Sequence, residues 1–205
     1  MKQRVRFLLL LALGVLPVLL TACAKLSMMA RQDQPPQAGA GEALIIFVRD
    51  TASTETTEAS ASLYDVTAAE TKFIGIINPG TKLAYAVKPG QHTFMVLAYS
   101  TDFLEASVAA GPSYYAQVFT ATATTGFSLK PRTMFRAIRK SEFEDRNFRK
   151  MDENAQFVGK APGADAWYAR SAPAVAARRA KLLPEWLNKP REQRTSQTLN
   201  VADGR

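Results

Sequence analysis

The sequence holds one cysteine, Cys23, and one histidine, His92, among its 205 residues. A lone cysteine cannot form a disulfide within its own chain, so a disulfide-stabilised scaffold is excluded. Metal sites built on histidine need partner ligands that this chain lacks. We therefore expect no metal and no cofactor, and we interpret His92 as a structural or surface residue at the start of a strand.

The common sequence motifs of catalysis are missing as well. The chain has no glycine-rich phosphate loop and no serine nucleophile elbow. Two carboxylates held at a defined separation can hydrolyse glycosides, and four acidic residues lie near loops or strand ends: Asp50, Asp65, Asp102 and Glu105. Solvated surface charge is the simpler explanation for them. The sequence therefore names no catalytic residue and favours a protein that is not an enzyme.

No apolar run reaches the length of a membrane-spanning helix. The run Phe7–Leu20 has 14 residues and contains Pro17, whereas a spanning helix needs about 20 apolar residues. A short cationic segment, Met1–Arg6, precedes it, and small residues lead from it to Cys23. This layout predicts a secretory signal peptide over residues 1–22, which is removed on export.

The residues Leu20-Thr21-Ala22-Cys23 resemble the lipobox of bacterial lipoproteins, in which small residues precede a cysteine that becomes the mature N-terminus. The resemblance implies diacylglycerol on the Cys23 sulfur, cleavage before this residue, and an acyl chain such as palmitate on its new amino group. Each buried CH₂ contributes about 0.8 kcal/mol, so three chains would form a lasting membrane anchor. A free thiol, an intermolecular disulfide and an ordinary secreted protein are the alternatives.

The residue after Cys23 bears on the destination. In lipoproteins of the Gram-negative type an aspartate at this position tends to retain the protein at the inner membrane, and this chain has Ala24. The resemblance therefore implies the outer membrane, at its periplasmic face. We expect membrane lipid as one partner and an envelope protein or peptidoglycan as another. We expect no nucleic acid, because a signal peptide directs the chain away from it.

Charge is unevenly distributed along the mature chain. Residues 23–129 contain six basic and nine acidic side chains, a charge of −3, whereas residues 130–205 contain 17 and nine, a charge of +8. Segments of opposite sign attract either each other or different partners. For the basic segment, packing against the acidic part of the chain and binding to anionic headgroups are both open, and we favour packing because it needs no external partner.

Composition separates a tether from a strand-rich domain. Residues 23–42 form the lipidated N-terminus and a linker rich in Gln, Ala, Pro and Gly, which we expect to be flexible and to span about 25 Å. Residues 43–130 contain short β-branched and aromatic runs separated by turn residues. The expected strands are Ala43–Arg49, Ala61–Val66, Lys72–Ile77, Leu83–Val87, His92–Tyr99, Phe103–Val108, Tyr114–Ala121 and Gly126–Lys130. Their spacing predicts a mainly β fold, a small antiparallel β-sandwich.

Two turns in this domain share a motif. Asn78-Pro79-Gly80-Thr81 and Lys88-Pro89-Gly90-Gln91 place proline second and glycine third, as a tight type II turn requires. The strand His92–Tyr99 is apolar on both faces, which predicts a central position in its sheet. In the strand Tyr114–Ala121, Tyr114 and Tyr115 must face opposite ways. We interpret both as packed residues, with presentation of one ring to a sugar or protein as the alternative.

The domain resembles bacterial lipoprotein β-domains of unknown function that are similar to PEGA-type modules. The residues that carry this resemblance are Leu44–Arg49, Val87–Thr93 and Ala110–Tyr115, and the similar region covers about 80 residues from Ala43 to Thr120. The resemblance implies a small β-sandwich. It implies no particular activity.

Residues 131–190 read as a basic helical extension. Ser141–Asn154 begins with a capping-box pattern, Ser141 with Glu144, and Ala164–Leu187 is amphipathic with expected breaks at Pro173 and Pro184. We expect residues 191–205 to be a disordered tail. Together these features favour a lipid-anchored, non-catalytic binding or structural module of the cell envelope. The alternative function is binding or hydrolysis of cell-wall glycans.

Overall fold

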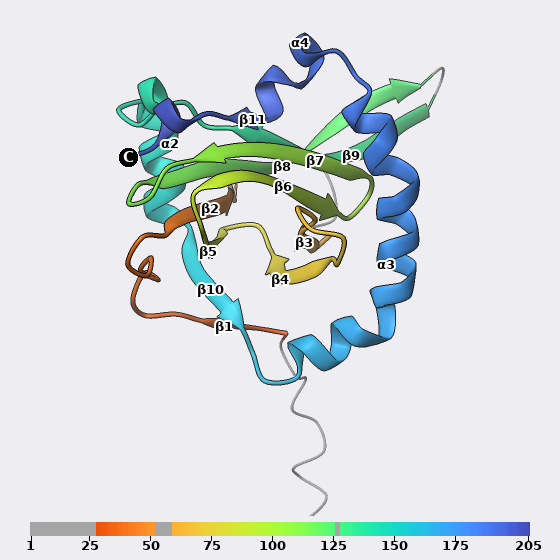
Figure 1. Ribbon diagram of the computed structural model, residues 1–205, viewed down its shortest axis with the longest axis horizontal. Helices are drawn as coiled ribbons and strands as arrows, with labels where there is room; N and C mark the ends of the chain where they lie inside the picture. Colours follow the sequence, from red (N-terminus) through yellow and green to blue (C-terminus); the bar gives the residue numbers. More distant parts are fainter. Residues whose placement is uncertain (1–27, 52–58, 126–127) are drawn as a thin grey trace, which may run out of the picture.

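The computed structural model describes residues 28–51, 59–125 and 128–205. The expected signal peptide and Cys23 lie outside this part of the chain. The described residues form two β-sheets with helices on their outer faces (Figure 1).

One sheet has six strands and the other has five. The six-stranded sheet, in spatial order, is β1 (Met29–Arg31), β10 (Gln156–Lys160), β5 (Thr81–Val87), β2 (Ala43–Arg49), β8 (Ser113–Thr125) and β9 (Ser128–Ala137). The five-stranded sheet is β11 (Thr198–Leu199), β7 (Thr101–Val108), β6 (Gly90–Leu97), β3 (Ala61–Asp65) and β4 (Lys72–Ile77). The expected central position of the strand beginning near His92 is confirmed, because β6 lies between β7 and β3.

Both sheets are mixed, so the expectation of a purely antiparallel arrangement was wrong. The pairs β2 with β8, β5 with β10 and β7 with β11 are parallel, and the other pairs are antiparallel. Side chains alternate with a period of two in either orientation, so the sequence pattern carries no information about strand direction.

The main core lies between the two sheets. Phe47 of β2 is fully buried, with its ring centroid 5.3 Å from that of Phe94 on β6 and 5.8 Å from that of Phe135 on β9. Contacts of this kind join side chains from both sheets into one cluster. Burial of these aromatic and branched side chains holds the sheets face to face.

Two further apolar clusters attach helices to the outer faces of the sheets. Helix α2 (Arg146–Asn154) packs Phe148 and Met151 against the six-stranded sheet, where alternate residues of β2 point outward. Helix α3 (Ala164–Leu187) packs Val175 and Trp186 against the five-stranded sheet. The interpretation that the basic segment packs on the β-domain is therefore confirmed.

The chain joins the folded body earlier than the expected tether allows. β1 pairs with β10 in three register positions, and Met29 is only 9% exposed in the main core. The Met29 sulfur accepts a hydrogen bond from the Ile76 amide at 3.2 Å. The prediction of a flexible linker over residues 23–42 was thus wrong for β1. The composition of this segment is rich in Gln and Pro, and it gives no sign that a single apolar side chain, Met29, is buried in the core.

The boundary expected at residue 130 was also wrong. β9 continues through Pro131 to Ala137, where a helical extension was predicted. Proline is tolerated because β9 is the edge strand of its sheet, so the missing amide breaks no bond to a further strand. β10 then interrupts the helical region, because its residues complete the six-stranded sheet between β1 and β5.

Helix α2 begins later than the capping-box pattern predicted. A 3-10 turn, η1 (Lys140–Glu142), occupies the expected first turn, and Asp145 is the N-cap. The Asp145 carboxylate accepts hydrogen bonds from the amides of Asn147 at 2.6 Å and Phe148 at 3.3 Å. Aspartate and serine are equally favoured as N-cap residues, and in this protein Asp145 takes the position that the sequence pattern had assigned to Ser141.

Helix α3 runs unbroken through both prolines, so the expected breaks were wrong. A proline deprives the carbonyl four residues earlier of its partner. These carbonyls belong to Ala169 and Ala180, which are both exposed, so water can take the place of the missing amide. The helix follows a curved path from the end of the molecule that holds β1 to the end that holds α4 (Figure 1).

The C-terminal residues 191–205 are ordered, contrary to the prediction of a disordered tail. They form α4 (Arg191–Arg194), η2 (Thr195–Gln197), β11 and η3 (Val201–Asp203). Leu199 is fully buried in the main core, and Arg139 donates to the Asp203 carboxylate at 2.8 Å and to the Thr198 carbonyl at 2.6 Å. The polar segment 191–205 is thus ordered by contacts with residues that are distant in the sequence, such as Arg139.

The two Pro-Gly turns carry the chain between the sheets. Gly80 has a φ of 73°, and the Thr81 amide donates to the Asn78 carbonyl at 3.1 Å, as expected for a type II turn. Gly90 has a φ of 136° and already belongs to β6. The first turn leads from β4 to β5 and the second from β5 to β6, so each connects a strand of one sheet to a strand of the other.

Candidate functional site

The structure disperses the four acidic residues that the sequence singled out. Asp50 and Asp65 line two different pockets, and Glu105 lines a third. Asp102 is only 8% exposed and lies in the protein interior. A pair of carboxylates flanking one substrate would require two of these residues together.

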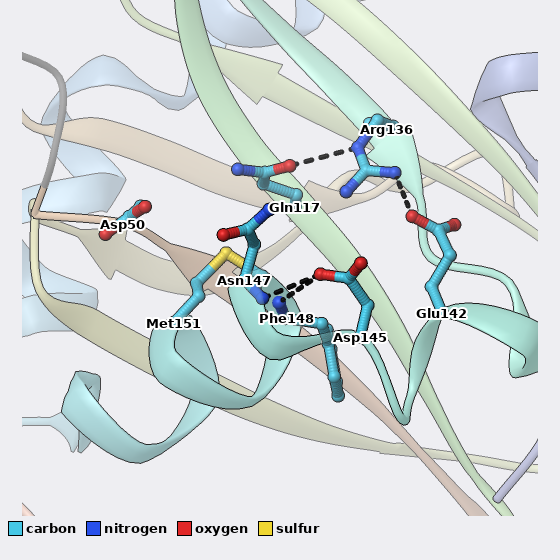
Figure 2. Close-up of a pocket in the computed structure, with 8 residues that line it drawn as sticks. All are labelled: Asp50, Gln117, Arg136, Glu142, Asp145, Asn147, Phe148 and Met151. Carbon is cyan, nitrogen blue, oxygen red and sulfur yellow. Dashed lines mark hydrogen bonds and ion pairs between the residues drawn. The ribbon is translucent and has the colours of Figure 1, made fainter.

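The first pocket lies where α2 meets β8 and β9 (Figure 2). It has a volume of about 260 Å³ and is lined by Asp50, Gln117, Arg136, Glu142, Asp145, Asn147, Phe148 and Met151. The Arg136 guanidinium bridges the Gln117 side chain at 3.0 Å and the Glu142 carboxylate at 2.5 Å. Asp50 lies at the opposite side of the pocket from Arg136.

The charged groups of this pocket serve the local fold. Glu142 accepts from the backbone amide of Arg139 at 2.8 Å as well as from Arg136, and Asp145 caps α2. Asp50 accepts from the Thr51 hydroxyl at 3.3 Å. Because these interactions occupy the carboxylates, we interpret the pocket as the joint between α2 and its sheet.

The second pocket brings together two residues that the sequence had treated separately, His92 and Asp65. It has a volume of about 380 Å³ and lies between β5, the start of β6 and the connection from β3 to β4. Three carboxylates and two lysines line it with one tyrosine and the histidine: Glu42, Asp65, Glu70, Lys72, Lys88, Tyr85 and His92. We call it the Tyr85 pocket.

A partly buried hydrogen bond organises the Tyr85 pocket. The Tyr85 hydroxyl donates to one Asp65 carboxylate oxygen at 3.1 Å, and the Thr67 amide donates to the other at 2.9 Å. Burial, followed by the nearby Asp65 charge, raises the pKa of Tyr85 to about 12. The phenol therefore remains a hydrogen-bond donor throughout the neutral range.

His92 has a structural role at the rim of this pocket. Its Nε2 lies 2.7 Å from the Lys88 carbonyl, which only accepts, so Nε2 carries the proton. The imidazole stacks on Phe94 with the ring centroids 6.1 Å apart. Nδ1 is buried and has no hydrogen-bond partner among the described residues.

The third pocket lies between β6, β7 and the C-terminal segment. It has a volume of about 450 Å³, and its walls include Gln91, Ser107, Arg191 and Asn200. Arg194, 8% exposed, contacts Glu105 at 2.5 Å and lies over the Trp186 ring at 5.1 Å from its centroid. This ion pair joins the C-terminal segment to β7, so Glu105 has a structural partner.

Asp102 connects β7 to two other elements. One of its oxygens accepts from the Phe135 amide of β9 at 2.8 Å and from the Gln197 side chain. Burial raises the pKa of the Asp102 carboxyl above its usual value, and the hydrogen bonds that favour the charged form oppose this shift. Asp102 thus links β7 to β9 and to the C-terminal segment, and it lines none of the three pockets.

The adjacent tyrosines pack on opposite faces of β8, as predicted. Tyr114 is fully buried in the core between the sheets, and its hydroxyl accepts from the Ala109 amide at 2.9 Å. Tyr115 is 7% exposed and packs edge-on against Phe143 and Phe148 under α2. Neither ring is presented to a ligand, which confirms the packing interpretation.

Sequence reasoning missed Tyr85 and Arg194. Nothing near Tyr85 in the sequence indicated Asp65 as its partner, 20 residues away. Arg194 lay in the segment expected to be disordered. Both are joined to their partners only by the packing of distant elements.

Within residues 28–51, 59–125 and 128–205, no cluster of three or more His, Cys, Asp or Glu side chains could hold a metal ion. In the same described ranges, no helix combines the length and the apolar character needed to cross a bilayer. No known protein-family model matches the chain, and a search of curated proteins found no match.

Proposed function

We propose that this protein is a lipid-anchored module of the bacterial cell envelope, a β-sandwich that binds or supports other envelope components without catalysis. The single observation that carries the proposal is the lipobox-like stretch ending in Cys23, directly after a short apolar run. In the proposed mature form, acyl chains on Cys23 hold the body at the periplasmic face of the outer membrane.

The arrangement of the carboxylates supports a non-catalytic role. Asp50, Asp65 and Glu105 lie in three different pockets. Asp65 is engaged by Tyr85 and Glu105 by Arg194. A module of this kind acts through its surface, and its ordered body gives a partner a fixed shape to recognise.

Replacing the anchor residue tests the proposal. We expect Cys23→Ala to move the protein from the membrane pellet to the soluble fraction or to leave it uncleaved, because no acyl chain can then be attached. The neighbouring variant Lys25→Ala is the matched control and should stay in the pellet after high-salt and carbonate washing. Mass spectrometry of the N-terminal peptide should find acyl chains on Cys23 in protein isolated from cells. An unmodified sulfur, or a Cys23→Ala protein that stays in the washed pellet, would contradict the proposal.

Binding of cell-wall glycans is the second candidate function, and the Tyr85 pocket favours it. Its carboxylates and the Tyr85 hydroxyl offer the acceptors and donors that sugar hydroxyls require. Its volume of about 380 Å³ lies within the range of small-ligand pockets.

A sedimentation experiment separates the two candidates. If the second candidate holds, purified protein that lacks the anchor should co-sediment with peptidoglycan through the Tyr85 pocket. In that case Tyr85→Phe should reduce binding several-fold, whereas Tyr168→Phe, which removes a hydroxyl that donates to the Thr71 carbonyl outside the pocket, should not. Release of muropeptides into the supernatant would overturn the non-catalytic role altogether.

A further inference from the structure

We propose that one particular end of the molecule faces the bilayer. This end, which we call the β1 edge, consists of Met28–Arg31 together with Lys160–Asp165, the turn from β10 into α3. The inference rests on the proposed acylation of Cys23 and adds to it the orientation of the body. The occupant of the β1 edge is the lipid surface that holds the acyl chains.

The length of chain between the anchor and the body carries the argument. Five Cα–Cα steps, through four intervening residues, lead from Cys23 to Met28, and they span at most about 18 Å. A compact domain of this size has a radius of gyration of about 16 Å and is about 40 Å across. The reach of the chain is therefore less than half the width of the body, so the far end of the molecule cannot turn to the membrane.

The point at which the chain enters the body is firmly held. Met29 is 9% exposed, and the β1–β10 pairing is extended by hydrogen bonds at both ends. The Ala161 amide donates to the Met28 carbonyl at 3.0 Å, and the Gln32 amide donates to the Phe157 carbonyl at 2.9 Å. Detaching β1 to gain reach would expose Met29 and break this pairing, so the anchor point stays at the β1 edge.

The charges at and beside the β1 edge do not oppose approach to a surface of anionic headgroups. Arg31 contacts Asp33 at 3.6 Å and Lys160 contacts Asp165 at 2.7 Å, and all four side chains are partly or largely exposed. The basic and acidic groups balance, so no net negative charge opposes close approach. Helix α4 lies at the opposite end of the molecule (Figure 1), and its residues Arg191 and Arg194 line the third pocket. In this orientation that pocket points away from the bilayer, where a wall or protein partner is within reach.

The two tryptophans provide natural probes of this orientation. Trp167 lies in the first turns of α3 near the β1 edge, and Trp186 lies near its other end. Trp167 and Trp186 are 19 positions apart in the sequence, which corresponds to about 28 Å of helix. Energy transfer from each tryptophan to an acceptor in the headgroup layer therefore reports which end is closer to the bilayer.

The experiment uses the mature chain, Cys23–Arg205, coupled through its only thiol to a maleimide lipid. The vesicles contain phosphatidylethanolamine and phosphatidylglycerol with a dansyl-labelled headgroup. The variant Trp186→Phe leaves Trp167 as the donor, and Trp167→Phe leaves Trp186. We expect energy transfer from Trp167 to be several-fold more efficient than from Trp186. Equal transfer, or more efficient transfer from Trp186, would overturn the proposed orientation.

A second pair of samples tests the cause. Inserting about 30 Gly and Ser residues between Ser27 and Met28 lengthens the flexible reach to about 30 Å, and the difference between the donors should then shrink markedly. A difference that persists unchanged would show that the short chain is not what orients the body.

Because the thiol is coupled in vitro, these results do not depend on whether cells acylate Cys23. A failure here leaves the lipid anchor standing, and an unmodified Cys23 in cells would overturn the anchor alone.

Discussion

Asp102 illustrates how one buried side chain connects distant parts of this protein. It lies on β7, is 8% exposed, and accepts hydrogen bonds from the backbone of β9 and from Gln197 in the C-terminal segment. In the sequence it appears as an ordinary acidic residue next to a strand. Neither its burial nor its partners can be inferred from its neighbours, because the partners lie 33 and 95 positions away.

The raised pKa of Asp102 predicts a pH dependence of stability. Because burial raises its pKa in the folded state, the folded protein binds a proton at a pH at which the unfolded chain has released it. The stabilisation from this group is thus fully present below its unfolded pKa of 3.8 and is lost as the pH rises through the higher folded pKa. We expect the free energy of unfolding of the wild type, relative to Asp102→Asn, to increase as the pH falls from 7 towards 4.

Urea unfolding of both proteins at several pH values measures this difference. The exposed Asp33, whose side chain is 93% accessible, supplies the control, and Asp33→Asn should follow the wild type across the range. A difference between wild type and Asp102→Asn that stays constant or decreases on acidification would contradict the assignment.

At the scale of elements, the C-terminal segment is the largest departure from the sequence-based expectation. Its composition is polar, and only Leu199 enters the main core. Its order depends on Arg139, whose guanidinium contacts the carbonyls of Thr195 and Thr198 and the carboxylate of Asp203. Helices α2 and α3 could be predicted because their apolar residues recur with the helical period, whereas the contacts that order this segment involve single residues without a period.

Removing the Arg139 side chain should loosen the C-terminal segment. Arg139→Ala leaves Asp203, 8% exposed, without its cation and two carbonyls without a donor. We expect a loss of about 2 kcal/mol in the free energy of unfolding. Faster hydrogen exchange of the amides of residues 195–205 should accompany this loss.

The matched control is Arg149→Ala. Its ion pair with Glu144 spans 3.3 Å between side chains that are 54% and 88% exposed, and its removal should cost at most about 0.5 kcal/mol. If the two arginine variants were equally stable, the view that Arg139 orders the segment would have to be abandoned.

At the scale of the whole molecule, one core joins the two sheets, so the body should unfold as a unit. Phe47 is central to this core, because its ring contacts Phe94 of the other sheet and Phe135 of its own. We expect Phe47→Ala to lower the free energy of unfolding by about 3–5 kcal/mol. The loss of β-sheet circular dichroism and the change in tryptophan fluorescence from α3 should still coincide in a single transition.

An exposed aromatic residue serves as the comparison. Tyr99 is 38% exposed, and Tyr99→Ala should cost far less than Phe47→Ala, since little of its apolar surface leaves the protein interior. Two separate transitions in the wild type, one for circular dichroism and one for fluorescence, would argue against a common core.

Features that depend on a local pattern could be predicted from the amino-acid sequence. The strands from Ala43 to Val108, the helix Ala164–Leu187, the turn at Asn78–Thr81 and the opposed tyrosines of β8 follow from side-chain alternation, helical period and the φ preferences of proline and glycine. The lipobox-like stretch at Cys23 likewise stands in the sequence alone. Only the folded chain revealed the strand directions, the positions of β1 and β10 in the six-stranded sheet, and the order of residues 191–205. It also brought Asp65, Tyr85 and His92 to one pocket. These features depend on pairs of residues that are far apart in the chain. Such a pair contributes to the free energy of folding only after packing has brought its members together and removed them from water, so the sequence alone does not show it.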